Sequence, residues 1–212
     1  MPLDLAVIES RWWRNGNSSV RGLFDVLSDI HEDDPAAYHY EMFNNRSSLE
    51  EIVRRTARRY RNIYLAAHGS ERSILGAEGR RSNNISRTKF RNILRQTAGL
   101  GRSRLRGLFV GSCNFINEEN AQFLLENRRG QAVKIRWVAG YSREIDFIDS
   151  SVVDLYFWNA YYLSEKQSER AKIKDVAEQI NSFMPGAHRN LAFNIFLRRG
   201  SEVKRLLPLA DG

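Results

Sequence analysis

The chain has 212 residues, of which 42% are hydrophobic and 27% charged, a composition typical of a globular protein. No window approaches the roughly 18 consecutive apolar residues of a membrane-spanning helix, and no basic stretch followed by an apolar one opens the chain, so we expect neither a membrane segment nor a secretory signal. The single cysteine, Cys113, cannot form an internal disulfide, and a free thiol is typical of the reducing cytoplasm. We therefore predict one cytoplasmic domain over residues 1–212.

The net charge of +8 is concentrated in the middle of the chain. Residues 51–108 carry 15 basic and 3 acidic side chains, a balance that could attract nucleic acid or an acidic protein. On a helix over residues 48–60, however, the arginines fall between apolar positions and would form its solvent face. Since no zinc-ligand spacing, helix-turn-helix pattern or run of interleaved aromatic residues accompanies the charge, we do not expect nucleic acid as the partner.

Strands and helices alternate through the first half of the sequence. The predicted elements of this half span residues 3–8, 20–30, 37–43, 48–60 and 62–67. Ser18 or Ser19 would cap the first helix, and Ser47 with Glu50 would form a capping box at the start of the second. Residues 70–84 contain a glycine-rich turn and are predicted to form a small hairpin or loop over the sheet.

The second half continues the alternation. Its predicted elements span residues 86–99, 107–112, 117–128, 134–141, 147–163, 168–183 and 191–197. The helix over 147–163 is apolar on almost every side, so part of it is expected to meet a regulatory protein or a second copy of the chain, unless the helix over 168–183 covers that side. The strand over 191–197 is expected at an edge. The alternation predicts a mostly parallel α/β sheet with helices on both faces and function at the carboxyl ends of the strands.

Two of the predicted parallel strands end in side chains that could act together. His68 and Gly69 follow one strand, and Cys113 follows the next, 45 residues after the histidine. The carboxyl ends of adjacent parallel strands meet at one sheet edge, where an imidazole could take the proton of the thiol. We predict a catalytic dyad of His68 and Cys113, with the N–H groups of Gly69 and Cys113 as the oxyanion hole. Otherwise Cys113 is a small buried hydrophobe and His68 a hydrogen-bonded loop residue.

Cofactors are not expected. A Walker phosphate loop and a dinucleotide GxGxxG are both absent from the sequence. No His, Cys, Asp or Glu residues recur at metal-ligand spacing either. Catalysis would therefore depend on protein side chains.

A strand ending in His-Gly, a helix, and a strand ending in a small residue and Cys resemble the caspase-like fold of clan CD cysteine peptidases. The histidine precedes the cysteine, as in this clan and unlike the papain order. Residues 138–146, before a long apolar helix, resemble the bacterial CHAT-type branch, which is related to separase. Covering roughly residues 3–163, the resemblance implies an α/β/α sandwich and an endopeptidase that cleaves proteins. Gly111-Ser112-Cys113-Asn114 replaces the caspase Gln-Ala-Cys-x-Gly signature, so caspase specificity is not carried over.

The resemblance leaves two possibilities for the residue recognised before the scissile bond. Glu144 and Asp146 lie where CHAT-type and separase-like relatives place acidic residues, and carboxylates there would favour arginine or lysine. Arg21, at a helix start, resembles the basic residue with which caspases bind an acidic side chain. The sequence favours the basic substrate.

Two other functions stay open. A catalytically inert caspase-like module would bind a partner through residues 51–108 and 147–163 without cleaving it. A basic α/β protein that binds nucleic acid would do so with an affinity that falls steeply with salt.

Overall fold

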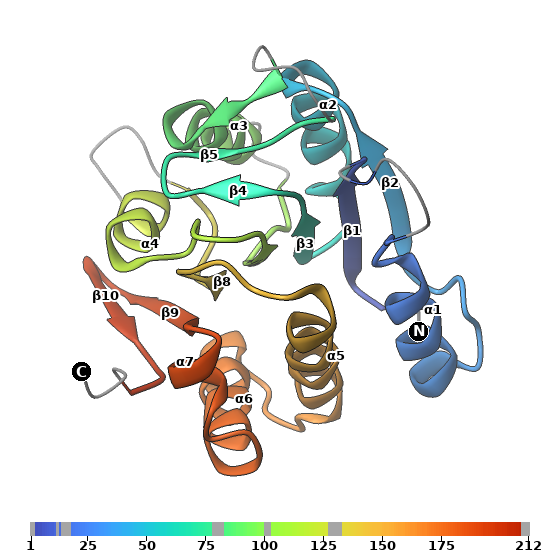
Figure 1. Cartoon of the computed structure of the whole chain (residues 1–212), viewed down its shortest axis with the longest axis vertical. Helices are drawn as coiled ribbons and strands as arrows, with labels where there is room; N and C mark the ends of the chain where they lie inside the picture. The colour runs from blue at the N-terminus through green and yellow to red at the C-terminus, as the bar shows by residue number, and fades with distance from the viewer. Residues whose placement is uncertain are drawn as a thin grey trace.

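The computed structural model describes residues 3–11, 13, 18–77, 83–99, 103–126 and 133–208. They form a sheet with helices on both faces (Figure 1). From one edge to the other, its seven strands are β10 (Glu202–Arg205), β9 (Phe193–Arg199), β8 (Trp137–Tyr141), β7 (Gly107–Gly111), β3 (Asn62–Ala66), β1 (Leu5–Ser10) and β2 (His39–Phe43). β2, β1, β3, β7 and β8 are parallel, whereas β9 and β10 are each antiparallel to the strand before them. The predicted mostly parallel α/β sheet is confirmed.

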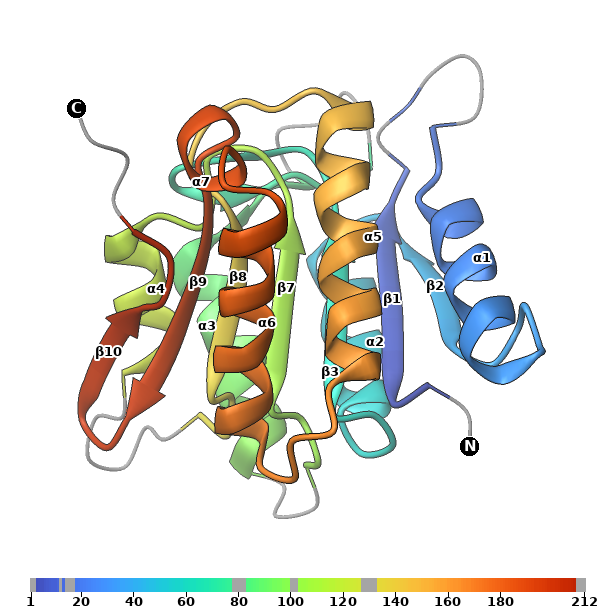
Figure 2. The ribbon, with the colours of Figure 1, turned by 90° about the horizontal axis from the view of Figure 1, so that it is seen from below.

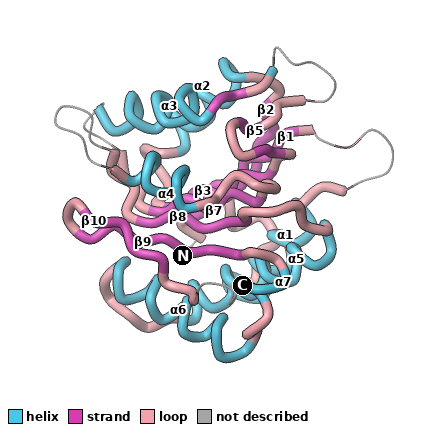
Figure 3. The backbone as a smooth tube through the Cα atoms, turned by 60° about the vertical axis from the view of Figure 1, so that its left-hand side comes forward, coloured by secondary structure: helices cyan, strands magenta, loops and turns pink. Residues whose placement is uncertain are grey.

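Three helices cover each face of the sheet, giving the layers seen in Figure 3. One face packs against α1 (Arg21–Glu32), α5 (Phe147–Leu163) and α6 (Glu169–Phe183), which lie in front of the sheet in Figure 2. The other packs against α2 (Arg46–Thr56), α3 (Arg87–Gly99) and α4 (Glu118–Leu125). A short helix, α7 (Ala187–Asn190), precedes β9.

The inner parallel strands β1, β3, β7 and β8 are buried on both sides because their alternate side chains enter two different cores. In β3, Ile63 and Leu65 join the core under α2, α3 and α4, while Tyr64 and Ala66 join the one under α1, α5 and α6. This explains why the sequence of β3 is one continuous apolar run. Its register with β7 pairs Ala66 with Gly111, so the two strands end side by side.

The apolar helix α5 lies across the middle of its face, between α1 and α6. The ring of Phe109 in β7 lies 5.0 Å from Phe157 and 6.1 Å from Trp158, centre to centre. Contacts with α6 favour the expectation that the helix over 168–183 covers part of the remaining surface. Ile148 and Val152 are still 66% and 56% exposed, so a partner at α5 stays a prediction.

A small antiparallel sheet lies over the carboxyl edge of the large one. It consists of β4 (Gly69–Ser70), β5 (Ser73–Ile74) and β6 (Ile85–Ser86). The hairpin predicted over 70–84 is therefore confirmed, although residues 78–82 lie outside the described part of the chain.

The caps predicted for the first two helices are wrong, whereas Ser86, predicted to cap the helix over 86–99, accepts from the N–H of Lys89 over 3.3 Å. Helix α1 has Val20 as its N-cap. Ser19 lies one residue before the cap position, where its hydroxyl donates to the carboxylate of Glu9 and its oxygen accepts from the N–H of Arg21 over 3.1 Å. Helix α2 begins at Arg46, where Asn45 and Ser48 form the capping box that was predicted for Ser47 and Glu50. In α2, a polar side chain two residues before the predicted one caps the first turn.

The strand predicted over 191–197 is β9, which begins and ends two residues later than predicted and does not lie at the edge. β10 pairs with it from Glu202 opposite Arg199 to Arg205 opposite Phe196. Helix α4 ends at Leu125, and residues 127–128 of its predicted extent are outside the described residues. No helix in the described ranges combines the length and the apolar character needed to cross a membrane.

Candidate active site

The ends of β3 and β7 touch at the carboxyl edge of the sheet. A Cβ atom at Gly69 would lie 1.9 Å from the hydroxyl oxygen of Ser112 and 2.8 Å from the carbonyl oxygen of Cys113, so only glycine fits there. One residue before His68, the N–H of Ala67 donates to the carbonyl of Gly111 over 3.4 Å. The structure therefore brings His68 and Cys113 to one place on adjacent strands.

The turn that carries Cys113 is held by the loop before α5. Asn114 has a left-handed φ of 62°, a conformation that asparagine adopts more readily than most residues, and its N–H donates to Arg143 over 3.1 Å. The half-buried thiol of Cys113 donates a weak hydrogen bond to the carbonyl of Ile145, with the sulfur 4.0 Å away. These contacts direct the sulfur toward the residues that start α5.

His68 is exposed at the junction between β3 and the small sheet. Its carbonyl accepts a hydrogen bond of 2.9 Å from the N–H of Leu75. In an antiparallel pair the hydrogen-bonded and non-bonded positions alternate, so Gly69, which pairs with Ile74, is at a non-bonded position. The N–H of Gly69 consequently points away from β5, so that an oxyanion could accept it.

A cavity of about 170 Å³ opens between these strand ends and α5. His68, Cys113 and Asp146 border it, and the more deeply buried Tyr64 and Asp154 line its inner part. A second buried carboxylate fixes the nearby entry to α1: Glu9 accepts hydrogen bonds from the N–H of Val20 over 3.0 Å and from the hydroxyl of Ser19 over 2.6 Å. Val20 thereby becomes part of the cavity wall.

Asp154 is the site residue that the sequence analysis missed. Its carboxylate accepts hydrogen bonds from the hydroxyls of Tyr64 and Tyr141, the latter at 2.6 Å, and is only 3% exposed. Burial raises the pKa of Asp154 from 3.8 to about 7, although the two phenol hydrogen bonds oppose the shift. The available signal was an aspartate in the middle of a helix that is apolar on almost every side.

The backbone leaves room for Tyr64 only because residue 111 is glycine. A Cβ at Gly111 would meet the hydroxyl oxygen of Tyr64 at 2.3 Å. Desolvation and the carboxylate of Asp154 raise the pKa of Tyr64 and of Tyr141 well above the ordinary value, so both phenols stay protonated as donors. The two tyrosines and the aspartate thus form one unit beneath the turn of Cys113.

Of the three predicted specificity residues, the structure brings only Asp146 to the cavity. Its carboxylate serves as the N-cap of α5, accepting from the N–H of Ile148 at 2.7 Å. Glu144 is exposed and does not line the cavity. The structure does not place Arg21 at the cavity. Its side chain is 62% exposed, lies 3.8 Å from Asp25 and borders a different hollow. Arg21 directly follows Val20, and successive side chains of a helix point in different directions.

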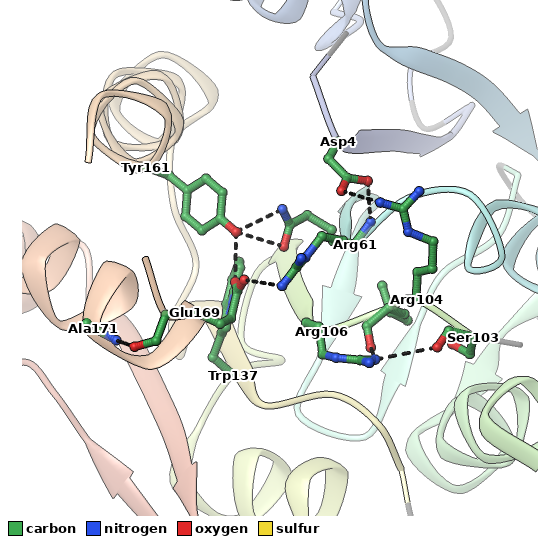
Figure 4. Close-up of polar contacts among 12 residues, drawn as sticks. Asp4, Arg61, Ser103, Arg104, Arg106, Trp137, Tyr161, Glu169 and Ala171 are labelled. Carbon is green, nitrogen blue, oxygen red and sulfur yellow. Dashed lines mark hydrogen bonds and ion pairs between the residues drawn. The ribbon is translucent and has the colours of Figure 1, made fainter. Parts of the chain in front are cut away.

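The opposite, amino-terminal edge of the sheet carries a network of ion pairs and hydrogen bonds (Figure 4). Arg104 lies 3.1 Å from Asp4, and Arg61 lies 3.6 Å from the buried Glu169. Glu169 also accepts hydrogen bonds of 2.7 Å from the indole N–H of Trp137 and from the hydroxyl of Tyr161. These contacts connect the starts of β1, β3, β7 and β8 to the first residue of α6.

Comparison of the sequence with protein-family models and with curated proteins finds no match. Within the described residues, no group of three or more His, Cys, Asp and Glu side chains is arranged to hold a metal ion. The residues at the carboxyl edge of the sheet are therefore the candidates for function.

Proposed function

We propose that the chain is a cysteine endopeptidase that cleaves protein substrates with Cys113 as the nucleophile and His68 as the general base. The supporting observation is the contact between the two strand ends, where Gly69 lies against Ser112 and Cys113 beside an open cavity. An imidazole and a thiol at adjacent strand ends satisfy the basic requirement for covalent catalysis by cysteine.

In the first half of the reaction, the imidazole of His68 takes the proton of the Cys113 thiol as the sulfur attacks the scissile carbonyl carbon. The resulting oxyanion would accept hydrogen bonds from the N–H groups of Gly69 and Cys113, each worth about 10²–10³ in rate. Collapse of this intermediate breaks the C–N bond, and His68 returns its proton to the leaving amine.

In the second half, a water molecule attacks the thioester formed on Cys113. His68 now accepts the proton of that water, the carbonyl re-forms, and the sulfur leaves to recover the proton from His68. The substrate carboxylate departs and the thiol is restored, so the cycle needs no cofactor.

The sheet order supports a caspase-like α/β/α sandwich of clan CD for this enzyme. The histidine follows β3 and the cysteine follows β7, its parallel neighbour, and the loop over 142–146 leads into the long helix α5. That loop is the segment that resembles the bacterial CHAT-type branch. A cytoplasmic location belongs to the same proposal, since the single thiol must stay reduced.

Alkylation of the single cysteine tests the dyad directly. Iodoacetamide should modify Cys113 rapidly at pH 6.5, and His68→Ala should slow both this reaction and peptide cleavage by about 10²–10⁴-fold. His39→Ala is the matched control, because His39 pairs with Glu41 on β2, away from the cavity. Cys113→Ala should fold normally and cleave no peptide.

An inert interaction module is the second candidate, favoured by the exposed apolar residues Ile148 and Val152 on α5. It predicts equal alkylation rates for the unmodified, His68→Ala and His39→Ala proteins. That result, with no cleavage of a denatured protein mixture, would replace the peptidase proposal.

A further inference from the structure

Asp154 is a buried carboxylate at a cavity that opens to solvent. It projects from the middle of α5 to line the cavity together with Cys113, and it is 3% exposed. In the described part of the chain, no lysine or arginine forms an ion pair with it. A buried carboxylate without a cation is costly to ionise, so a ligand that supplies the positive charge would gain binding energy.

The carboxylate of Asp154 has capacity for such a ligand. Two carboxylate oxygens offer about four acceptor positions, and the hydroxyls of Tyr64 and Tyr141 use one on each oxygen. The phenols hold the group in a fixed orientation and leave acceptor positions unused. A guanidinium or ammonium group could fill them without displacing either tyrosine.

The size and lining of the cavity suit one long side chain. Its volume is about 170 Å³, and a cavity of about 150 Å³ holds a molecule the size of benzene. Val20, Ala66 and Phe147 provide apolar walls between the cavity mouth and Asp154. Such walls accommodate the methylene stem of lysine or arginine while the charged end reaches a carboxylate.

The other acidic residues near the site are less suited to this role. The Asp146 carboxylate accepts hydrogen bonds from two backbone N–H groups of α5, and Glu144 does not line the cavity. An acidic substrate side chain would instead place a second carboxylate against Asp154, and like charges at such a distance repel.

We infer that the cavity beside Cys113 binds the side chain of an arginine or lysine residue and that Asp154 is the carboxylate that recognises it. A role of Asp154 as the specificity-determining residue of cleavage rests on the proposed peptidase function. Binding of the side chain in the cavity does not depend on that function.

The test uses two probes of nearly the same shape, n-butylguanidinium, which is charged, and n-butylurea, which is neutral. Their binding to the Cys113→Ala protein is measured by calorimetry at pH 8. The charged probe should bind about 10–100-fold more tightly, the range expected for a charge-assisted hydrogen bond. Because this protein cannot react covalently, the result stands whether or not the chain is a peptidase.

Asp154→Asn, in the same background, should bring the two affinities within about twofold, since the amide keeps the shape but loses the charge. Asp149→Asn is the matched control, because Asp149 is an exposed aspartate of the same helix that does not line the cavity. It should keep the preference for the charged probe, and so should Asp146→Asn. Equal binding of both probes by the parent, or a preference that survives Asp154→Asn, would overturn the inference.

A pH titration keeps the inference testable if Asp154→Asn does not fold. The titratable groups facing Asp154 are Tyr64, Tyr141 and Cys113, with His68 and Asp146 at the cavity border. In a Cys113→Ala, His68→Ala protein, affinity for n-butylguanidinium should fall about tenfold or more between pH 8 and pH 5.5, as protons compete for the carboxylate. Affinity that does not change over this range contradicts the role of Asp154.

Discussion

Glu169 and Asp154 are buried carboxylates near opposite edges of the sheet, and they differ in what surrounds them. Glu169, at the amino edge, accepts from Trp137 and Tyr161 and lies 3.6 Å from the guanidinium of Arg61. Asp154, toward the carboxyl edge, has two phenol donors and no ion pair within the described residues, and it lines a cavity. A carboxylate with a complete set of partners stabilises the fold, whereas one that lacks a cation beside an open cavity is available to a ligand.

The largest effect is expected at the amino edge. Glu169→Ala removes the shared acceptor of Trp137 and Tyr161 and the partner of Arg61, so chemical denaturation should show a loss of about 3–5 kcal/mol in the free energy of unfolding. Cys113 alkylation in the folded protein should be unchanged. Glu169→Gln, which keeps an acceptor, should lose less. If Glu169→Ala slows alkylation while the protein is still folded, the two edges are not separate in function.

Asp154→Asn should increase the free energy of unfolding, whereas Glu169→Ala should decrease it. The folded protein binds the proton of Asp154 up to about pH 7, whereas the unfolded chain releases it near 3.8, so ionisation destabilises the fold progressively across this interval. The difference corresponds to at most about 4 kcal/mol. The stability of Asp154→Asn relative to the unmodified protein should therefore rise from pH 4 to pH 7 and then level off, as measured by denaturation at each pH. A stability difference that does not vary with pH would show that burial does not raise the pKa of Asp154.

Gly69→Ala tests the contact between the strand ends. The added Cβ must push away Ser112 and the carbonyl of Cys113, and displacing catalytic groups by about 1 Å can reduce activity about 10²-fold. Peptide cleavage should fall by that order, with a smaller change in thermal stability. Gly22→Ala is the control, because nothing lies within 4 Å of its Cβ position. Full activity in Gly69→Ala would mean that the close approach does not matter for the proposed reaction.

The smallest effect is expected for an exposed pair. Arg104→Ala breaks the contact with Asp4, in which both side chains are solvent-accessible, so the loss of stability should be about 0–1 kcal/mol and should shrink in high salt. Denaturation in low and high salt measures it. A loss as large as that of Glu169→Ala would show that the amino edge depends on its whole network and not on its buried acid.

The buried parallel strands were predictable, because a strand buried on both faces has a continuous apolar sequence. Asn62–Ala66 and Gly107–Gly111 have this form, and each is followed by a chemically distinctive residue. The caps of α1 and α2 were not predictable at the level of single residues, since several polar side chains near each helix start can accept from backbone N–H groups, as Asn45, Glu9 and Ser19 do. β10 escaped prediction because its sequence, Glu-Val-Lys-Arg, is mostly polar.

The role of Asp154 could not be read from the sequence for a different reason. Its significance comes from Tyr64, which is 90 positions earlier in the chain, and from Tyr141, on another strand. Helical periodicity reports one polar residue on an apolar helix and says nothing about its partners. The predicted acids Glu144 and Asp146 were conspicuous because they lie in a loop, where most carboxylates contact water or cap a helix, as Asp146 does.

The pair of strands β9 and β10 also protects one lateral edge of the sheet against aggregation. β9 is buried and rich in apolar residues, and its outer backbone groups are paired with β10, where Glu202 and Lys204 are exposed. Charged side chains on an outermost strand discourage another chain from extending the sheet. Proteolysis after Arg199 would uncover the β9 backbone and create a template for fibrous aggregation. Pairing of another chain with β9 is thereby prevented while β10 stays in place.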